Sequence, residues 1–351
     1  MNRITRWTAT SAVAATLLAG ACSESTSPSS SDPSAMATAV TNLNAAFSQN
    51  AVFQSLAAIS SSVVLAAPPV VPQLVPGAGP AARSTPRDLM LQLARRAPTA
   101  TLALFPANEL GKTFQWDTAS GGRYRIIDST LSGAPANGIR FILYAVDTAT
   151  LKPTLPLRTT GLVDLVDVSN AQSNGIHLVL RVGSLTSADY TVTEVKTTSS
   201  LSLTSVGYVQ DVVTSGPQVN FNLSHLLSLP DSSLVTNYQA SGNGATVTMQ
   251  TSYSGAAAGK SETLDWLFQR NGSVEVIGGV KADSTNVEFK FNGSTFATVR
   301  ADTSGQPAFS GPNGRALTAG EMLSLLTIVE QFAEVYVNLT LVFLPALVFF
   351  G

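Results

Sequence analysis

Residues 245–253 read ATVTMQTSY, a stretch in which apolar and polar side chains alternate almost without error. Residues 218–224, QVNFNLS, repeat this pattern. Successive side chains of a β-strand point to opposite faces of the sheet, so a period of two predicts strands with one buried and one solvated face. Sheets solvated on one face are antiparallel as a rule. The two stretches therefore predict an antiparallel β domain.

The same period of two extends from about Thr113 to Arg300. No helical pattern intervenes, and parallel pairing would need long crossovers, so we expect a meander of ten to fourteen strands. Two turn dipeptides, Asn271-Gly272 and Asn292-Gly293, are typical of two-residue hairpins, and the second should pair Phe289 with Phe296. Besides the two stretches above, the candidate strands are residues 114–118, 123–128, 139–147, 161–168, 175–182, 190–196, 201–213, 233–239, 262–269, 273–280, 286–291 and 294–300.

The C-terminal segment, residues 318–351, is predicted to be an apolar helix. Thr318 and Glu321 have the spacing of a capping box, in which the two side chains satisfy free N–H groups of the first turn. After Glu334 there is no charged residue, and residues 339–350 hold nine large apolar side chains. At about 1.5–3 kcal/mol for each buried side chain, up to about 14–27 kcal/mol opposes leaving this segment in water.

Two environments could enclose this segment. A membrane span needs about 20 apolar residues, whereas residues 335–350 provide sixteen, interrupted by Asn338, Thr340 and Pro345. A sheet of more than about ten strands curls because its twist accumulates, and a half-barrel or open barrel has a concave face too wide for its own side chains to fill. We favour the second environment, in which the helix packs on the concave face. The expected contacts with the sheet or an apolar ligand are Phe332, Tyr336, Phe343, Phe349 and Phe350.

The expected fold class is thus mainly β, a large curled antiparallel meander with an N-terminal helical segment and an apolar C-terminal helix. This plan resembles the half-barrels with internal helices of periplasmic lipoprotein and lipid carriers, at the level of architecture and without a shared sequence motif.

Before the β domain, residues 33–82 contain no charged residue. Within them, residues 35–65 have apolar side chains at three-and-four spacing, which predicts one or two helices packed on the core. Six prolines in residues 66–86 indicate an extended linker. Thr85-Pro86-Arg87-Asp88 is typical of a helix start, with Pro86 in the first turn and the helix running to about Arg96. The β domain, with this short helix, is expected to span residues 87–317.

The first 22 residues indicate export. Arg3 and Arg6 precede an apolar run, and the stretch ends in Leu18-Ala19-Gly20-Ala21-Cys22, where Cys22 is the only cysteine of the chain. This leader resembles that of bacterial lipoproteins, whose lipobox ends at an acylated cysteine. It departs from that pattern because Ala19 stands where leucine is preferred, and Ala19-Gly20-Ala21 also fits ordinary secretory cleavage, which would leave Cys22 as a free thiol.

The resemblance implies removal of residues 1–21, a lipidated Cys22, and a flexible tether over residues 22–34. It also implies sorting through Ser23 to the outer membrane, facing the periplasm or the surface. The mature chain then has 18 basic and 22 acidic residues, a net charge of −4.

Composition excludes several classes of function. Only 12% of the 351 residues are charged and no basic run occurs, so nucleic acid is not an expected partner. One cysteine and two histidines exclude a disulfide framework and cysteine-based metal sites. Phosphate-loop, nucleophile-elbow and zinc-protease motifs are absent, so we expect no cofactor, no metal and no catalytic residue. His177 and His225 could assist a serine nucleophile, but no partner spacing supports that role.

The sequence therefore predicts a non-enzymatic envelope lipoprotein, anchored to the membrane through Cys22, that binds or shields a lipid or other apolar ligand in its curled sheet. One alternative is a structural or adhesive surface lipoprotein without a ligand cavity. A second alternative is a hydrolase with an unrecognised site.

Overall fold

The computed structural model describes residues 86–95, 104–119, 121–147, 150, 152–254, 261–270, 272–281, 284–301 and 307–350, together with residues 41, 50, 55, 56 and 59. The predicted leader, Cys22, the tether and the linker at residues 66–85 lie outside these residues. Of the predicted helical segment 35–65, Thr41, Ser55, Leu56 and Ile59 are helical, and the side chains of Leu56 and Ile59 are buried in the core.

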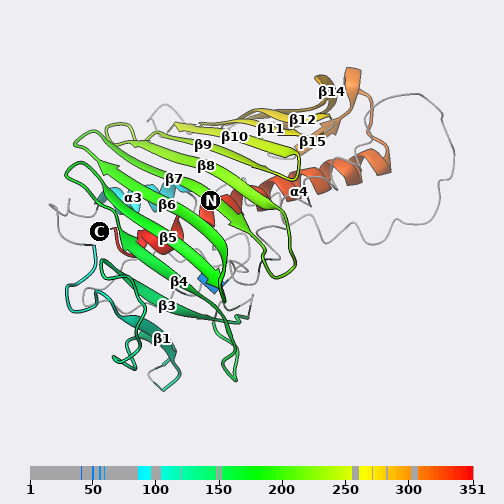
Figure 1. Ribbon diagram of the computed structural model, residues 1–351. Helices are drawn as coiled ribbons and strands as arrows, with labels where there is room; N and C mark the ends of the chain where they lie inside the picture. The colour runs from blue at the N-terminus through cyan, green and yellow to red at the C-terminus, as the bar shows by residue number, and fades with distance from the viewer. Residues whose placement is uncertain are drawn as a thin grey trace.

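The dominant element is one curled, open sheet of fifteen strands (Figure 1). The strands are β1 (Thr113–Asp117), β2 (Arg123–Arg125), β3 (Gly138–Tyr144), β4 (Thr159–Asp167), β5 (Asn174–Val182), β6 (Leu185–Lys196), β7 (Ser200–Gln210), β8 (Gln218–Ser228), β9 (Leu234–Gly242), β10 (Ala245–Ser254), β11 (Ser261–Gln269), β12 (Ser273–Lys281), β13 (Thr285–Phe291), β14 (Ser294–Ala301) and β15 (Pro307–Ser310). From β3 to β15 each strand pairs with the next one along the chain, so the predicted meander is confirmed.

All fourteen predicted strands are present, and the count exceeds the predicted range by one because of β15. That strand has four residues and lies at the edge of the sheet, so it lacks an alternating pattern that would reveal it. The antiparallel order has one exception, since β1 pairs with β3 in parallel.

The β13–β14 hairpin has the predicted turn but a different register. Asn292 and Gly293 have φ angles of 47° and 78°, as a two-residue hairpin turn requires. A β-bulge shifts the register after Phe289, which lies opposite Ala297, while the ring of Phe296 contacts that of Phe291 at 4.8 Å. The predicted pairing of Phe289 with Phe296 is therefore wrong, because the extra residue moves the partner by one position.

Two helical regions flank the sheet in sequence. Helix α3 (Pro86–Arg95) begins at the predicted proline. Helix α4 (Ala319–Leu341) has the predicted capping box, with both the Thr318 and Glu321 side chains in place. The single helix predicted for residues 318–351 is interrupted, because α4 ends at Leu341 and a short helix α5 (Leu344–Leu347) follows. Pro345 explains the break: it has no N–H for the carbonyl of Leu341, four residues earlier.

Both α4 and α5 lie on one side of the sheet, behind the strands that face the viewer in Figure 1. The buried apolar side chains of both helices and of β1–β14 form one core cluster. That side is the concave face of the curled sheet, so the predicted packing of the apolar C-terminal helix on this face is confirmed.

Candidate functional site

The C-terminal segment fills the concave face. Residues 342–350 are all buried, and Val342, Phe343, Ala346 and Phe350 have no exposed surface. The segment is apolar throughout, and each side chain loses its hydration in this position. The interior of the sheet is thus occupied by the protein's own chain.

Of the five predicted contact residues, four belong to the core of the concave face and Tyr336 packs against that core. The Phe332 ring contacts Trp266 of β11, and Tyr336 stacks on the rings of Trp266 and Tyr238 at 5.6 and 5.1 Å. Phe343 and Phe349 make edge-to-face contacts with His225 and Phe105, and Phe350 is fully buried. Aromatic pairs of this geometry stabilise a core beyond their area of burial.

A line of polar side chains crosses this apolar interior; we call His225, Tyr238, Tyr336 and Thr340 the polar seam. The Tyr238 hydroxyl lies 2.8 Å from Nε2 of His225 and 2.9 Å from Oγ1 of Thr340, and Thr340 donates to the carbonyl of Tyr336 at 2.8 Å. Burial lowers the pKa of His225 to about 3, so its imidazole is neutral at physiological pH. The alternating stretch at residues 218–224 predicted a strand that ends before His225, whereas β8 continues to Ser228 and contains His225.

Glu262 of β11 lies at the margin of the polar seam. It pairs with Tyr253 on β10 and Val280 on β12, and its negative charge acts on the Tyr336 hydroxyl. Burial raises the pKa of Glu262 to about 7. Glu262 was not among the residues predicted from the sequence, although it alternates with the outward-facing Thr263 and therefore points inward.

Among the buried polar atoms without a hydrogen-bond partner in the described part of the chain, three lie on neighbouring strands of the concave face: Tyr190 Oη, Ser205 Oγ and His225 Nδ1. They lie on three consecutive strands, β6, β7 and β8. Ser205 is opposite Val192 and Leu223, each two residues from Tyr190 or His225, so the three side chains are diagonal neighbours on one face. Each such group costs about 1–3 kcal/mol when buried without a partner.

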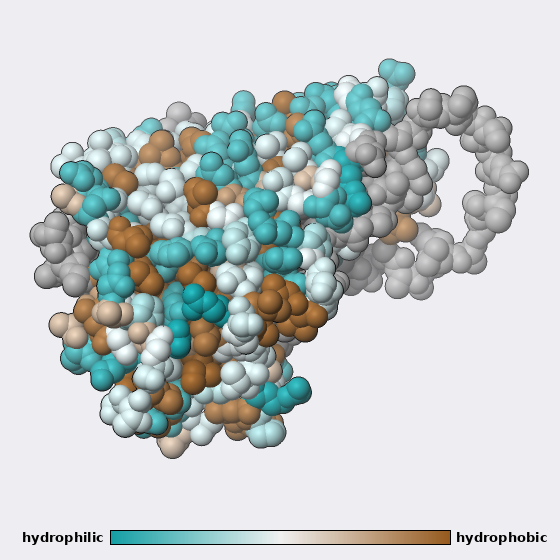
Figure 2. Space-filling view, viewed as in Figure 1, coloured by the Kyte–Doolittle hydropathy of each residue, from teal (hydrophilic) through white to brown (hydrophobic). Residues whose placement is uncertain are grey.

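The outer, convex face of the same sheet is polar and carries few charges over β7–β10. Figure 2 views this face and shows mainly hydrophilic and intermediate residues with scattered apolar patches. On it, Asp164 is held by Arg140 and Arg181 at 2.6 Å each. Asp167 points to the other face and accepts from the Leu104 N–H, so the two aspartates do not form an acid–base pair.

His177 also lies on the outer face, where Asp189 of β6 is 2.7 Å from its Nε2. Sequence reasoning missed this acid, because its position depends on the register of the β5–β6 hairpin. No serine or cysteine hydrogen-bonded to His177 occurs in the described ranges, so the pair lacks the nucleophile of a hydrolytic triad. Among those residues no cluster of three metal-ligating side chains occurs either.

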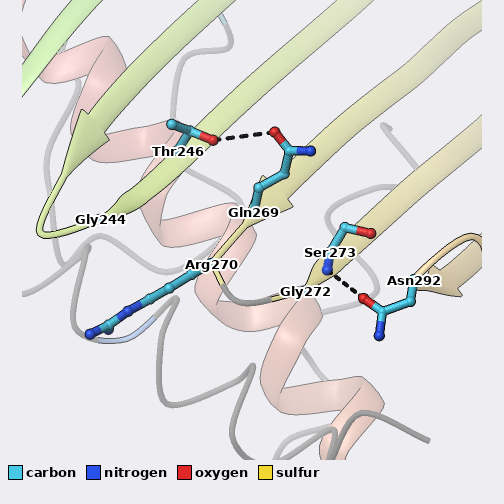
Figure 3. A pocket seen from close by; sticks show the side chains of 7 residues that line it. All are labelled: Gly244, Thr246, Gln269, Arg270, Gly272, Ser273 and Asn292. Carbon is cyan, nitrogen blue, oxygen red and sulfur yellow. Dashed lines mark hydrogen bonds between the residues drawn. The ribbon is translucent and has the colours of Figure 1, made fainter.

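An open hollow of about 590 Å³ lies on the outer face, at the hairpin ends of β9–β13 (Figure 3). It is lined by Gly244, Thr246, Gln269, Arg270, Gly272, Ser273 and Asn292. Thr246 donates to Oε1 of Gln269, and Oδ1 of Asn292 accepts from the Ser273 N–H at 2.7 Å. The hollow is polar, in contrast with the concave face.

Comparisons with protein-family models, with curated proteins and with solved structures give no match for this chain. By length and composition α4 could cross a membrane, but a helix packed in a protein core passes the same test. What the fold and site define is a class: a curled antiparallel sheet closed on its concave face by an apolar C-terminal helix.

Proposed function

We propose that the protein is a membrane-anchored envelope protein without enzymatic activity, whose curled sheet binds or shields an amphipathic lipid. The C-terminal segment occupies the concave face in the ligand-free state, and the lipid tail competes with it for the same apolar surface. The observation that carries this proposal is the combination, on one face, of an extensive apolar lining with three unpartnered polar atoms.

The apolar lining suits a hydrocarbon tail. Burial of each CH₂ group stabilises a complex by about 0.8 kcal/mol, and a tail recovers the burial lost when residues 342–350 leave the face. The exchange covers the sheet again but uncovers the displaced segment, and up to about 14–27 kcal/mol opposes leaving that segment in water. The proposal therefore requires that residues 342–350 move to another apolar environment, such as the membrane to which the protein is anchored.

The unpartnered atoms suit a polar headgroup. Tyr190 Oη, Ser205 Oγ and His225 Nδ1 are buried on adjacent strands, and a ligand hydroxyl or carboxyl group could hydrogen-bond to them. A carbon-only ligand would leave all three unsatisfied. We therefore propose a lipid with a small polar head, such as a fatty acid or fatty alcohol, in preference to a hydrocarbon.

The proposed location rests on the leader. Cys22 would carry the acyl anchor, and one acyl chain alone anchors only reversibly, so several chains are needed for stable attachment. Labelling cells with a palmitate analogue, in parallel with Cys22→Ser, tests this part: label on the native chain alone supports the anchor, and label on both or neither contradicts it.

The lipid proposal is tested by extracting the purified protein with organic solvent for mass spectrometry, and by titrating a fluorescent fatty acid into the delipidated protein. Phe343→Ala should weaken the C-terminal occupant and raise the fatty-acid affinity, whereas Leu323→Ala, at an exposed position of α4, should not. Absence of stoichiometric lipid together with absence of fatty-acid binding would contradict the proposal.

One observation favours the alternative, a structural or adhesive surface protein. The concave face is filled, and the hollow described above lies on the outer face. In that case the interior serves stability alone, and recognition belongs to the outer face. The fatty-acid titration distinguishes the two proposals.

A further inference from the structure

The outer face carries a row of polar side chains that plays no part in the lipid proposal. Six amide and hydroxyl side chains form one row across β8–β13. Register places Asn220 opposite Ser241, Ser241 opposite Thr246, Thr246 opposite Gln269 and Gln269 opposite Ser273, and Ser273 contacts Asn292. With strands about 4.8 Å apart, the row is about 24 Å long. We call these six residues the outer row.

The outer row offers hydrogen bonds without charge. Asn220, Thr246, Gln269 and Asn292 are exposed, and none of the six side chains is ionisable. The Oε1 atom of Gln269 accepts from Thr246, which leaves its amide group to donate outward. Hydroxyl and amide groups of this kind match the hydroxyl groups of a sugar, which both donate and accept.

A single cation adjoins the outer row. Arg270 follows β11 and lines the same hollow, and its side chain extends from the end of that strand below the β9–β10 turn that carries Gly244, away from Gln269, Ser273 and Asn292 (Figure 3). Among the residues that the structure describes, no carboxylate pairs with Arg270, and none lines the hollow. Glu275, two residues beyond Ser273, is held by Lys290 at 3.0 Å. The hollow therefore carries a net positive charge.

We propose that the hollow binds a short oligosaccharide that carries an oxoanion, with the sugar hydroxyls on the outer row and the oxoanion on the Arg270 guanidinium. A guanidinium binds a carboxylate or phosphate group through two parallel hydrogen bonds, which a neutral sugar cannot make. The volume of about 590 Å³ lies within the range of small-molecule sites, about 300–1,000 Å³.

The test is calorimetric titration of the full chain with four probes: trigalacturonate, neutral maltotriose, a hexose phosphate and inorganic phosphate. Arg270→Gln should weaken binding of the acidic sugar about ten- to hundredfold, the usual effect of losing a hydrogen bond to a charged group. Arg300→Gln is the matched control, because Arg300 is exposed on β14 outside the hollow. Ser273→Ala should weaken all sugar binding severalfold and leave the fold unchanged.

Preference for trigalacturonate identifies the oxoanion as a carboxylate, and preference for the hexose phosphate identifies it as a phosphate; both support the site. Equal binding of maltotriose and trigalacturonate overturns the role of Arg270. Inorganic phosphate that binds as tightly as the sugars overturns the role of the outer row. Equal losses in Arg270→Gln and Arg300→Gln, or no binding of either acidic sugar at millimolar concentration, overturn the site. Fatty-acid binding should be the same in all these variants.

Discussion

The two faces of β8 and β9 differ in both burial and polarity. On the concave face, Leu223, His225 and Tyr238 are buried against α4 and the segment that follows it. On the outer face, Asn222 and Gln239 of the same strands are exposed. One residue along the chain thus separates a position that determines stability from a position free for recognition.

The largest effect on this contrast is expected when the C-terminal segment after Glu334, which fills the concave face, is removed. Truncation after Glu334 exposes the apolar lining of the sheet and deletes a segment whose burial contributes up to about 14–27 kcal/mol, whereas a native domain is usually stable by only about 5–15 kcal/mol. We expect aggregation and binding of an apolar dye, measured by size-exclusion chromatography and fluorescence. A soluble truncated protein of unchanged stability would contradict the contrast.

Truncation of a single inward side chain should also lower the free energy of unfolding. Phe343→Ala should lower the free energy of unfolding by about 3–5 kcal/mol, because it leaves a cavity against His225. Leu323→Ala, on the exposed side of α4, should change it by less than about 0.5 kcal/mol. Urea unfolding measures both, and equal effects would show that α4 is not packed as described.

Glu262 should make stability fall with rising pH. Its pKa is about 7 in the folded protein and about 4.5 when unfolded, so the folded state holds its proton more tightly. The contribution is fully present below about pH 4.5 and is lost as pH rises through 7, up to about 3 kcal/mol. Glu262→Gln should remove this loss. The difference in the free energy of unfolding between the variant and the native protein should therefore shift in favour of the variant from pH 4.5 to pH 8. Parallel pH profiles of unfolding would argue that Glu262 is solvated.

His225 should have the opposite effect. Its folded pKa is about 3 against 6.5 when unfolded, so the unfolded state takes up a proton first as pH falls below 6.5. The native protein should lose about 2 kcal/mol between pH 6.5 and 5 from this group. His225→Gln should flatten that part of the profile. An unchanged acid slope would mean that the imidazole reaches water.

The smallest effects belong to the outer face. Asn222→Ala or Thr248→Ala should change the free energy of unfolding by less than about 0.5 kcal/mol, since both side chains are exposed. A loss above 2 kcal/mol in either variant would place a structural role on this face.

Much of the fold was predictable because it follows from periodicity. Alternation located fourteen strands, and the Thr318–Glu321 spacing located the start of α4. The apolar run after Glu334 required enclosure, and the width of the sheet provided a place for it. Each of these signals is local or depends on strand number.

What remained unpredictable depends on register. A β-bulge after Leu180 shifts the β5–β6 hairpin by one residue, so that Leu178 and not His177 lies opposite Tyr190. Without the bulge Tyr190 would point outward, because a slip of one residue exchanges the two faces. The His177–Asp189 pair, the unpartnered Tyr190 hydroxyl and the Phe291–Phe296 contact all follow from such bulges, which single-sequence patterns do not reveal.

The central claim is that residues 342–350 are enclosed by the concave face of their own sheet. Hydrogen exchange of the full chain in detergent-free buffer tests it most directly. We predict that the amides of residues 342–350 are protected as strongly as those of β8 and β9, and that Phe343→Ala weakens both together. Exchange of residues 342–350 within seconds, while β8 and β9 stay protected, would contradict the claim.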